Sequence, residues 1–244
     1  MAILRTISER RLQPEIIDQP DIDARRLGGA LRGLERINWW SGSARILWRP
    51  ICELARECPA PLRILDIATG AGDVPIRLWR KARRAGLALE IAGCDRSAQA
   101  VAYARARAAE HGATIQFFTW DAVQGGFPGE PDAVMSSLFL HHLEETQAIA
   151  LLRSMAAAAR RMVLVNDLER TRAGFVLAYL GTRVLSASPV VHTDGPRSVE
   201  GAFTLGEARE LTRRAGLAGA AVGRRWPCRY LLSWRRRPAA EELA

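Results

Sequence analysis

Residues 64–73, Ile-Leu-Asp-Ile-Ala-Thr-Gly-Ala-Gly-Asp, constrain the fold of this 244-residue chain more than any other segment. An apolar run of strand character passes directly into a turn that contains Gly70 and Gly72, and a helical pattern begins at Asp73. Glycine lets the backbone turn sharply and approach a ligand with no Cβ in the way. Pro75 falls in the first turn of the expected helix, where its missing N–H breaks no helical hydrogen bond. The segment therefore predicts a strand–turn–helix unit with a ligand at the turn.

The rest of the chain continues this alternation. Apolar runs of strand length lie at 63–68, 89–94, 114–118, 132–136 and 161–166, with helical patterns at 73–85, 97–111 and 143–159. Units of this length predict a parallel sheet with helices on both faces. A capping box at Thr204 and Glu207 predicts a further helix over 205–215. Two more strands are expected at 217–223 and 229–235.

Three segments stand outside the alternation and set the expected organisation. Residues 1–60 are helical and amphipathic in pattern and are expected to form an N-terminal cap. Residues 61–237 form the α/β domain, and an insertion at about 171–202 is expected to act as a lid or substrate cap. Its part at 173–187 is apolar and helical, which equally fits a packing or dimer helix, and a loop is expected after it. Residues 238–244 are expected to form a flexible tail.

Charge and cysteine content exclude several classes of function. The net charge is +9, but nearly all the cations are dispersed arginines, with Lys81 as the single lysine, so a nucleic-acid partner is not expected. The four cysteines show no CxxC or CxxH spacing, so no metal site is expected and the chain is expected to be reduced and cytoplasmic. The sequence predicts no secretory signal, and because no apolar run reaches about 18 residues, no membrane span is expected either.

The glycine-rich turn also carries two acids, Asp66 and Asp73. A dinucleotide-binding turn has the pattern GxGxxG, and here Pro75 occupies the place of the third glycine. Carboxylates beside a pyrophosphate would repel it, whereas a cationic ligand tolerates them. The turn therefore favours S-adenosylmethionine, which carries an amino group and a sulfonium, over a nicotinamide dinucleotide.

Two further acids follow the next strands. Asp95 ends the second strand, and an acid about 20 residues after the turn can accept hydrogen bonds from both ribose hydroxyls. Ser97 can cap the following helix, which leaves Asp95 available to a ligand. Asp121 follows the third strand and can accept from an adenine amino group, while Trp120 can cover the ring. The alternative is that Asp121 only stabilises a turn.

A pair of histidines follows the fourth strand. This strand delivers Ser136 and Ser137 to the carboxyl edge of the sheet, where open α/β sheets bind ligands, and His141 and His142 come next. Imidazole titrates in the range that general-base catalysis requires. Either histidine is therefore a candidate base.

Taken together, these segments resemble the class I methyltransferases, and most of all the branch containing the ubiquinone and menaquinone biosynthesis methyltransferases. The similarity covers about 60–170, with weaker support from 203–235. It implies a three-layer, Rossmann-like α/β fold with a seven-stranded, mostly parallel sheet whose last strand is antiparallel, and S-adenosylmethionine as cofactor. It implies that the methionine end of the cofactor is lined by Asp66, Thr69, Gly70 and Gly72. It implies that Asp95 holds the ribose, with Arg96 beside the adenine, and that Asp121 and Ala122 contact the adenine edge. Ser137 would lie near the sulfonium.

The sequence departs from the family at two places. Ala68 stands where the family usually has its first loop glycine, and we expect this small residue to be tolerated there. The N/D-P-P-Y/F motif of enzymes that methylate nucleic-acid amino groups is replaced by Ser136-Ser-Leu-Phe139, which counts against that reaction. A magnesium-dependent enzyme of the catechol type is kept open only by Asn166–Asp167 after the fifth strand.

The resemblance implies methyl transfer to a small molecule. A phenol or quinol acceptor needs a base, for which the candidates are His142, then His141, then His192 in the inserted segment. Aromatic and aliphatic residues of the cap predict an apolar or aromatic acceptor of polyketide or prenylquinone type, methylated on oxygen, with methylation on carbon as the alternative. An RNA methyltransferase and a non-catalytic scaffold remain as competing hypotheses. The expected assembly is a monomer or homodimer.

Overall fold

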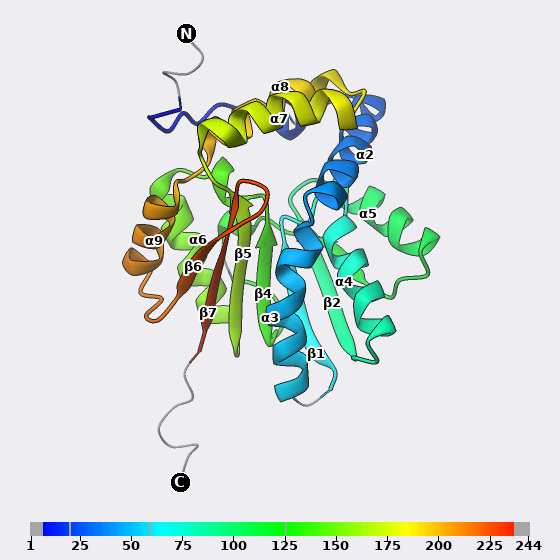
Figure 1. The fold of residues 1–244 in the computed structure, drawn as a ribbon. Coiled ribbons are helices and arrows are strands. Elements are labelled where there is room, and N and C mark those ends of the chain that lie inside the picture. Colours follow the sequence, from blue (N-terminus) through cyan, green and yellow to red (C-terminus); the bar gives the residue numbers. More distant parts are fainter. Residues whose placement is uncertain (1–6, 20, 59, 125, 237–244) are drawn as a thin grey trace.

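A computed structural model describes residues 7–19, 21–58, 60–124 and 126–236, so the tail expected at 238–244 lies outside the described residues. Seven strands form one sheet in the order β3-β2-β1-β4-β5-β7-β6 (Figure 1). They are β1 (Leu62–Ile67), β2 (Leu89–Asp95), β3 (Gln116–Thr119), β4 (Ala133–Ser137), β5 (Met162–Leu168), β6 (Ala221–Arg225) and β7 (Arg229–Arg235). Strands β1 to β5 are parallel, and β7 is antiparallel to both β5 and β6. The predicted seven-stranded sheet with an antiparallel last strand is confirmed.

Helices cover both faces of this sheet. On one face lie α3 (Ser43–Glu57), α4 (Asp73–Arg84) and α5 (Ala98–Glu110), and on the other lie α6 (Glu145–Ala158) and α9 (Leu205–Arg214). Strand β1 shows why the apolar runs are continuous. Ile64 packs under α3 and α4, whereas its neighbour Leu65 packs under α6. Strands buried on both faces need apolar side chains at successive positions, as a parallel sheet requires.

A helical layer lies over the carboxyl ends of the parallel strands, at the top of Figure 1. We call it the cap: η1 (Ile16–Asp18) with the segment from residue 7 that leads into it, α2 (Ala24–Trp40), α7 (Arg172–Leu185) and α8 (Pro189–Gly201). The two halves of the cap are far apart in sequence but joined in space. The carboxylate of Asp194 in α8 accepts hydrogen bonds of 3.0 Å from the backbone N–H groups of Ile16 and Ile17.

The loop predicted after residue 187 is wrong, because this segment forms α8. Pro189 fits the first helical turn, where it costs nothing, but Pro196 lies inside the helix. The helix forms nevertheless because Val190 and Val191 are buried against Ala30 of α2, so tertiary packing outweighs local propensity. None of the helices that the structure describes has the length and apolar character needed to cross a bilayer.

Candidate functional site

A cavity of about 950 Å³ lies between the carboxyl edge of the sheet and the cap. Its floor is formed by residues at or just beyond the carboxyl ends of β1, β2, β3 and β4, and its walls and roof by side chains of the cap. The floor includes most of the predicted cofactor-binding residues, namely Asp66, Ala68, Thr69, Gly70, Asp95, Arg96, Trp120, Asp121, Ala122 and Ser137. The structure therefore brings these predicted residues together around one space, at the edge where open α/β sheets bind ligands.

Asp66 is a buried carboxylate with one oxygen unused. Its Oδ2 accepts a hydrogen bond of 2.6 Å from Thr69 Oγ1, while its Oδ1 has no hydrogen-bond partner among the described residues. Burial raises the pKa of Asp66 to about 7, against the effect of the Thr69 hydrogen bond and with the help of the Asp73 charge.

Asp73, at the start of α4, repeats this arrangement. Its Oδ1 accepts from Asn38 Nδ2 of the cap at 3.3 Å, and its Oδ2 has no hydrogen-bond partner in the described part of the chain. Burial raises its pKa to about 6, although Arg77 and the Asn38 hydrogen bond oppose the shift. Two buried carboxylates with free oxygens at one cavity fit a ligand that brings positive charge and N–H donors.

Asp95 connects the two turns of the floor. Its Oδ2 accepts from the backbone N–H of Gly70 and its Oδ1 from that of Ser97, both at 2.9 Å. Ser97 caps α5 as predicted, since its Oγ accepts from the N–H of Ala100. Asp95 is thus not wholly free, but two carboxylate oxygens offer about four acceptor sites, so it can still accept from a ligand.

Gly72 was predicted to line the methionine end of the cofactor, and this role stays a prediction. Gly72 is not among the residues that line the cavity. A Cβ at this position, where φ is +70°, would lie 2.9 Å from both Ala104 Cβ and Phe117 Cζ. Gly72 therefore lets the turn pack closely against α5 and β3.

The residues predicted around adenine lie together but carry other contacts as well. Asp121 Oδ1 accepts from the N–H of Val123 at 2.9 Å, so it stabilises the turn that was the alternative reading. Arg96 forms an ion pair of 3.5 Å with Asp18 of the cap. Ser137 Oγ accepts from Asn166 Nδ2 at 2.9 Å, which fixes the hydroxyl at the end of β4.

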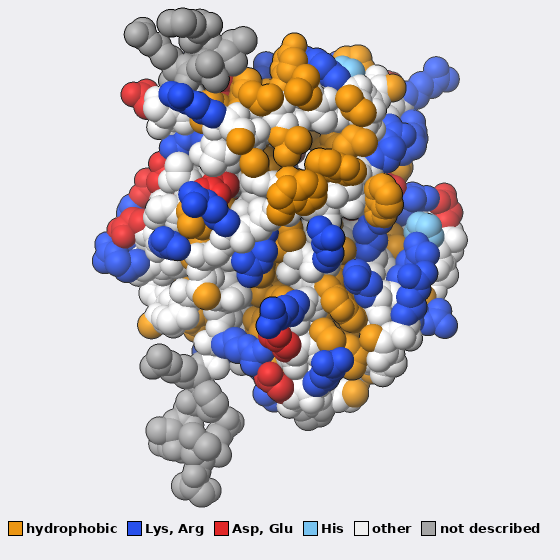
Figure 2. Space-filling model, in the orientation of Figure 1, with side chains coloured by type: hydrophobic (Ala, Val, Ile, Leu, Met, Phe, Trp, Pro, Cys, Tyr) orange, Lys and Arg blue, Asp and Glu red, His pale blue; other side chains and the backbone are white. Residues whose placement is uncertain are grey.

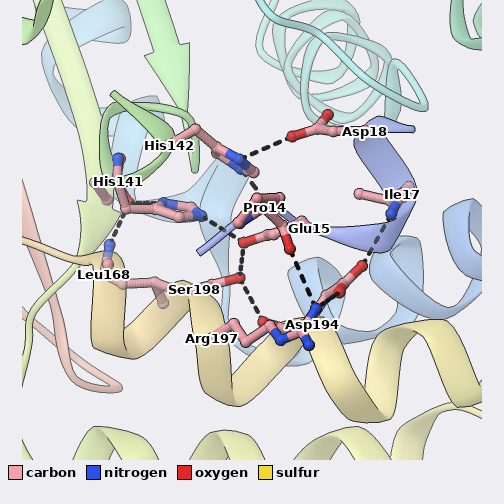
Figure 3. A network of polar contacts seen from close by, with 12 residues as sticks. Pro14, Glu15, Ile17, Asp18, His141, His142, Leu168, Asp194, Arg197 and Ser198 are labelled. Atoms are coloured by element: carbon pink, nitrogen blue, oxygen red, sulfur yellow. Dashed lines mark hydrogen bonds and ion pairs between the residues drawn. The ribbon is translucent and has the colours of Figure 1, made fainter. Parts of the chain in front are cut away.

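His141 and His142 lie in η3 (Leu140–His142), a short turn before α6, and both line the cavity. Figure 3 shows the His142 ring directed at the carboxylate of Asp18 and the His141 ring directed at that of Glu15. His141 Nδ1 lies 2.6 Å from Asp167 Oδ1, and His142 Nδ1 lies 3.0 Å from Asp18 Oδ2. Burial lowers the pKa of His142, but the Asp18 hydrogen bond and the nearby carboxylates outweigh it and raise the pKa to about 9.

His192 is not brought to the site. It lies in α8, its Nε2 is 2.7 Å from the backbone oxygen of Ser186, and it is not among the cavity-lining residues. Sequence reasoning missed Glu15 and Asp18, which the cap contributes to the cavity. Nothing local in the sequence marks them, because their roles arise from contacts with residues far along the chain.

Comparisons with known proteins identify methyltransferases as relatives of this chain. Residues 64–161 match the sequence family described as "Methyltransferase domain". The chain is 33% identical over 142 residues to a demethylmenaquinone methyltransferase of Thermus thermophilus, and 31% identical over 121 residues to one of Deinococcus radiodurans. These matches cover 57% and 49% of this chain, but 62% and 48% of the two relatives. The chain thus matches only about half to three fifths of their length.

Solved structures share the fold at low sequence identity. A magnesium protoporphyrin IX methyltransferase from Synechocystis PCC 6803 with bound SAH superposes with a TM-score of 0.56 at 18% identity, over 97% of this chain and 93% of that one. A SAM-dependent methyltransferase from Aquifex aeolicus superposes with a TM-score of 0.57 at 16% identity, over 88% of this chain and 99% of that one. At these identities the likeness extends to the fold alone.

Proposed function

We propose that this chain, whose residues 64–161 form a domain of the class I, S-adenosylmethionine-dependent methyltransferase family, transfers the methyl group of that cofactor to a small apolar or aromatic molecule. One observation carries the proposal: Asp66 and Asp73 each present a buried carboxylate oxygen with no partner among the described residues, beside the turn at Gly70. The ammonium and sulfonium groups of the cofactor would supply the missing positive charge.

The cofactor would lie along the floor of the cavity. We assign its methionine end to Asp66, Ala68, Thr69 and Gly70 and its ribose to the remaining acceptor sites of Asp95. We assign the adenine to Arg96, Trp120, Asp121 and Ala122, and the region of the sulfonium to Ser137. In this assignment the methyltransferase domain at 61–237 holds the cofactor through the part outside its insertion, and the segment 1–60 and the insertion at about 171–202 hold the acceptor.

The cap supports an apolar acceptor. Its side of the cavity includes Leu27, Leu31, Leu34, Leu177 and Leu185. Figure 2 shows that exposed apolar side chains gather on the upper part of the molecule, over the cap. The cap helices carry the exposed apolar side chains of Trp39, Trp40, Tyr179, Leu180 and Val184, and Trp226 in the turn between β6 and β7 is also exposed. The rings of Trp40 and Trp226 lie 5.2 Å apart, and Trp40 also lines the cavity, so this apolar surface continues inward.

Methyl transfer from a sulfonium is an in-line displacement, in which the acceptor atom forms a bond to the methyl carbon as the bond from carbon to sulfur breaks. The cavity would hold the two reactants close together and aligned. We favour O-methylation of a phenol or quinol, with the histidine pair as acceptor of the hydroxyl proton, and keep C-methylation as the alternative. His141 suits this role better than His142, since Asp167 holds its Nδ1 and leaves Nε2 toward the cavity, whereas the raised pKa of His142 keeps that ring protonated at neutral pH.

The proposal includes a cytoplasmic location, with all four cysteines unpaired, and a monomeric or homodimeric state. A nucleic-acid substrate is not part of it. On the face shown in Figure 2, Lys and Arg side chains are scattered and interrupted by apolar and neutral surface.

Calorimetric titration of the purified chain with S-adenosylmethionine and with S-adenosylhomocysteine tests the cofactor. We expect micromolar binding of both and none of NADH. A panel of phenols and quinols with a methyl-labelled donor then tests the acceptor. Absence of binding of either sulfur compound would reject the function, whereas binding without transfer to any member of the panel would reject only the acceptor class.

A further inference from the structure

Three potential ligand side chains converge where the residue before η1 lies beside η3. They are Glu15, His141 and His142, whose ligand atoms lie within 4.8 Å of one another. Figure 3 shows both imidazole rings and the Glu15 carboxylate turned toward a common point. We propose that these three residues form a binding site for a divalent transition-metal cation of the zinc type.

The distances between the histidine nitrogens and the Glu15 oxygens favour a bound cation over direct hydrogen bonds between these side chains. His141 Nε2 lies 3.8 Å from Glu15 Oε1, and His142 Nε2 lies 3.9 Å from Glu15 Oε2. Both distances exceed hydrogen-bonding range, so neither ring is bonded to the carboxylate. Zinc at about 2.0–2.1 Å from each ligand atom would bring such atoms to roughly 3–3.4 Å from one another. Small rotations of the three side chains would close the difference.

The remaining imidazole nitrogens have the partners that metal-bound histidines usually have. His141 Nδ1 lies 2.6 Å from Asp167 Oδ1, and His142 Nδ1 lies 3.0 Å from Asp18 Oδ2. A carboxylate on Nδ1 fixes the ring and the tautomer so that Nε2 presents its lone pair to the metal. Both histidines show this arrangement, and both direct Nε2 toward the same glutamate.

The charge of the cluster also favours a bound cation. The two imidazoles face the three carboxylates of Glu15, Asp18 and Asp167, and Glu15 and Asp167 are buried. Two neutral imidazoles would leave this negative charge uncompensated. A divalent cation would compensate it and would use the lone pairs of both rings.

The ligand set indicates which metal and which kind of site. Two imidazole nitrogens and one carboxylate are the protein ligands of catalytic zinc sites, which keep a position open for a small molecule. All three residues line the cavity, so the open position would face the bound acceptor. A metal there would occupy the nitrogens that otherwise accept a proton, and would instead lower the pKa of a coordinated hydroxyl.

The sequence did not predict this site. The argument against a zinc site was based on the spacing of the cysteines, and the ligands proposed here are other residues. Its ligands come from position 15 and positions 141 and 142, which only the fold brings together. The metal would replace the histidine base of the proposed function, but its binding is measurable without cofactor or acceptor, so the two proposals can fail separately.

The test is titration of the chelator-treated full chain with Zn²⁺ by calorimetry, and with Co²⁺ by absorption spectroscopy. We expect one equivalent of Zn²⁺ to bind with micromolar or tighter affinity. We expect visible Co²⁺ bands of low-symmetry coordination without the near-ultraviolet band of thiolate ligands, which separates this site from the four free cysteines.

Variants connect the binding to these residues. Glu15→Gln and His142→Gln should each weaken Zn²⁺ binding at least 100-fold, and Asp18→Asn about 10- to 100-fold through the orientation of His142. His111→Gln removes a histidine far from the cluster and should leave binding unchanged. Failure to bind a stoichiometric equivalent, or unchanged binding in both Glu15→Gln and His142→Gln, overturns the proposal. Because His142 is partly exposed, its variant serves if Glu15→Gln does not fold.

Discussion

The backbone N–H of Gly70 donates a hydrogen bond of 2.9 Å to Asp95 Oδ2, which joins the turn after β1 to the end of β2. Strands β1 and β2 are adjacent and parallel, so their carboxyl ends reach the cavity side by side. The same carboxylate therefore shapes the glycine-rich turn and faces the space assigned to the ribose. Loss of the Asp95 side chain should therefore weaken ligand binding in two ways, by removing an acceptor for the ribose and by removing the hydrogen bond that holds the turn at Gly70.

We expect Asp95→Ala to weaken binding of S-adenosylhomocysteine about 10- to 100-fold, which corresponds to about 1.4–2.8 kcal/mol. Calorimetric titration measures the effect. Ser97→Ala is the matched control, because it removes the cap of α5 and should cost about 1 kcal/mol of stability while affinity stays near that of the unchanged chain. Equal affinity in Asp95→Ala and the unchanged chain would reject the ribose assignment.

Ala68 holds a backbone conformation that favours glycine, with φ at +52°. A left-handed conformation costs a residue with a Cβ about 1–2 kcal/mol, while glycine adds about 0.4–1 kcal/mol of unfolded-state entropy. Ala68→Gly should therefore raise the free energy of unfolding by up to about 1 kcal/mol. Denaturant unfolding measures the change.

The control for Ala68 lies in the same turn. Ala71 is buried and is not among the residues with positive φ, so Ala71→Gly should lower the free energy of unfolding by about 0.5–1 kcal/mol. If both variants destabilise the chain to the same extent, the strain at Ala68 is not relieved by glycine and the interpretation fails.

The His142 contact with Asp18 predicts a pH dependence of stability. Because the pKa of His142 is raised from 6.5 to about 9 in the folded chain, the native state binds the proton more tightly than the unfolded state. Its contribution is fully present below about pH 6.5 and is lost as the pH rises to about 9. The metal-free chain should lose about 1–3 kcal/mol of unfolding free energy across this window.

Comparison of unfolding curves with those of His142→Gln isolates this effect, since the other titrating groups are common to both proteins. The difference in stability should shrink as the pH rises. A difference that stays constant from pH 6 to pH 9 would show that the His142 proton is not linked to folding.

Asp66 predicts a proton release on cofactor binding. Burial holds its pKa at about 7, so near that pH a substantial fraction of the carboxyl is protonated in the empty cavity. A cationic ligand favours the ionised form and should displace the proton. Titrations at pH 6.5 in buffers of different ionisation enthalpy should show this release, and Asp66→Asn should abolish its contribution. Identical heats in all buffers would place the ammonium group elsewhere.

The cofactor half of the site could be predicted from sequence because its signals are local. The turn at Gly70 and Gly72, the acids Asp66 and Asp95, and the strands that carry them form patterns that need no knowledge of distant contacts. The resemblance to the class I methyltransferases, inferred from these segments, is confirmed by the domain match over 64–161 and by the demethylmenaquinone methyltransferases.

The cap could not be predicted in the same way. Pro196 indicates a loop by local rules, yet buried contacts of Val190 and Val191 hold the segment as a helix, and this helix carries His192 away from the cavity. Glu15 and Asp18 gain their roles only from His141 and His142, more than a hundred residues along the chain. Such contacts depend on the fold and produce no local or periodic pattern from which the sequence could predict them.

The cap joins two separate stretches of chain, since Asp194 of α8 holds the backbone of Ile16 and Ile17. The cofactor floor, by contrast, comes almost entirely from one continuous stretch. A change of acceptor preference can therefore arise in the cap while the cofactor half is inherited unaltered. Transfer of acceptor preference from one relative to another, however, would require exchange of both stretches of the cap. Either stretch alone would have to pack against a segment from a different protein.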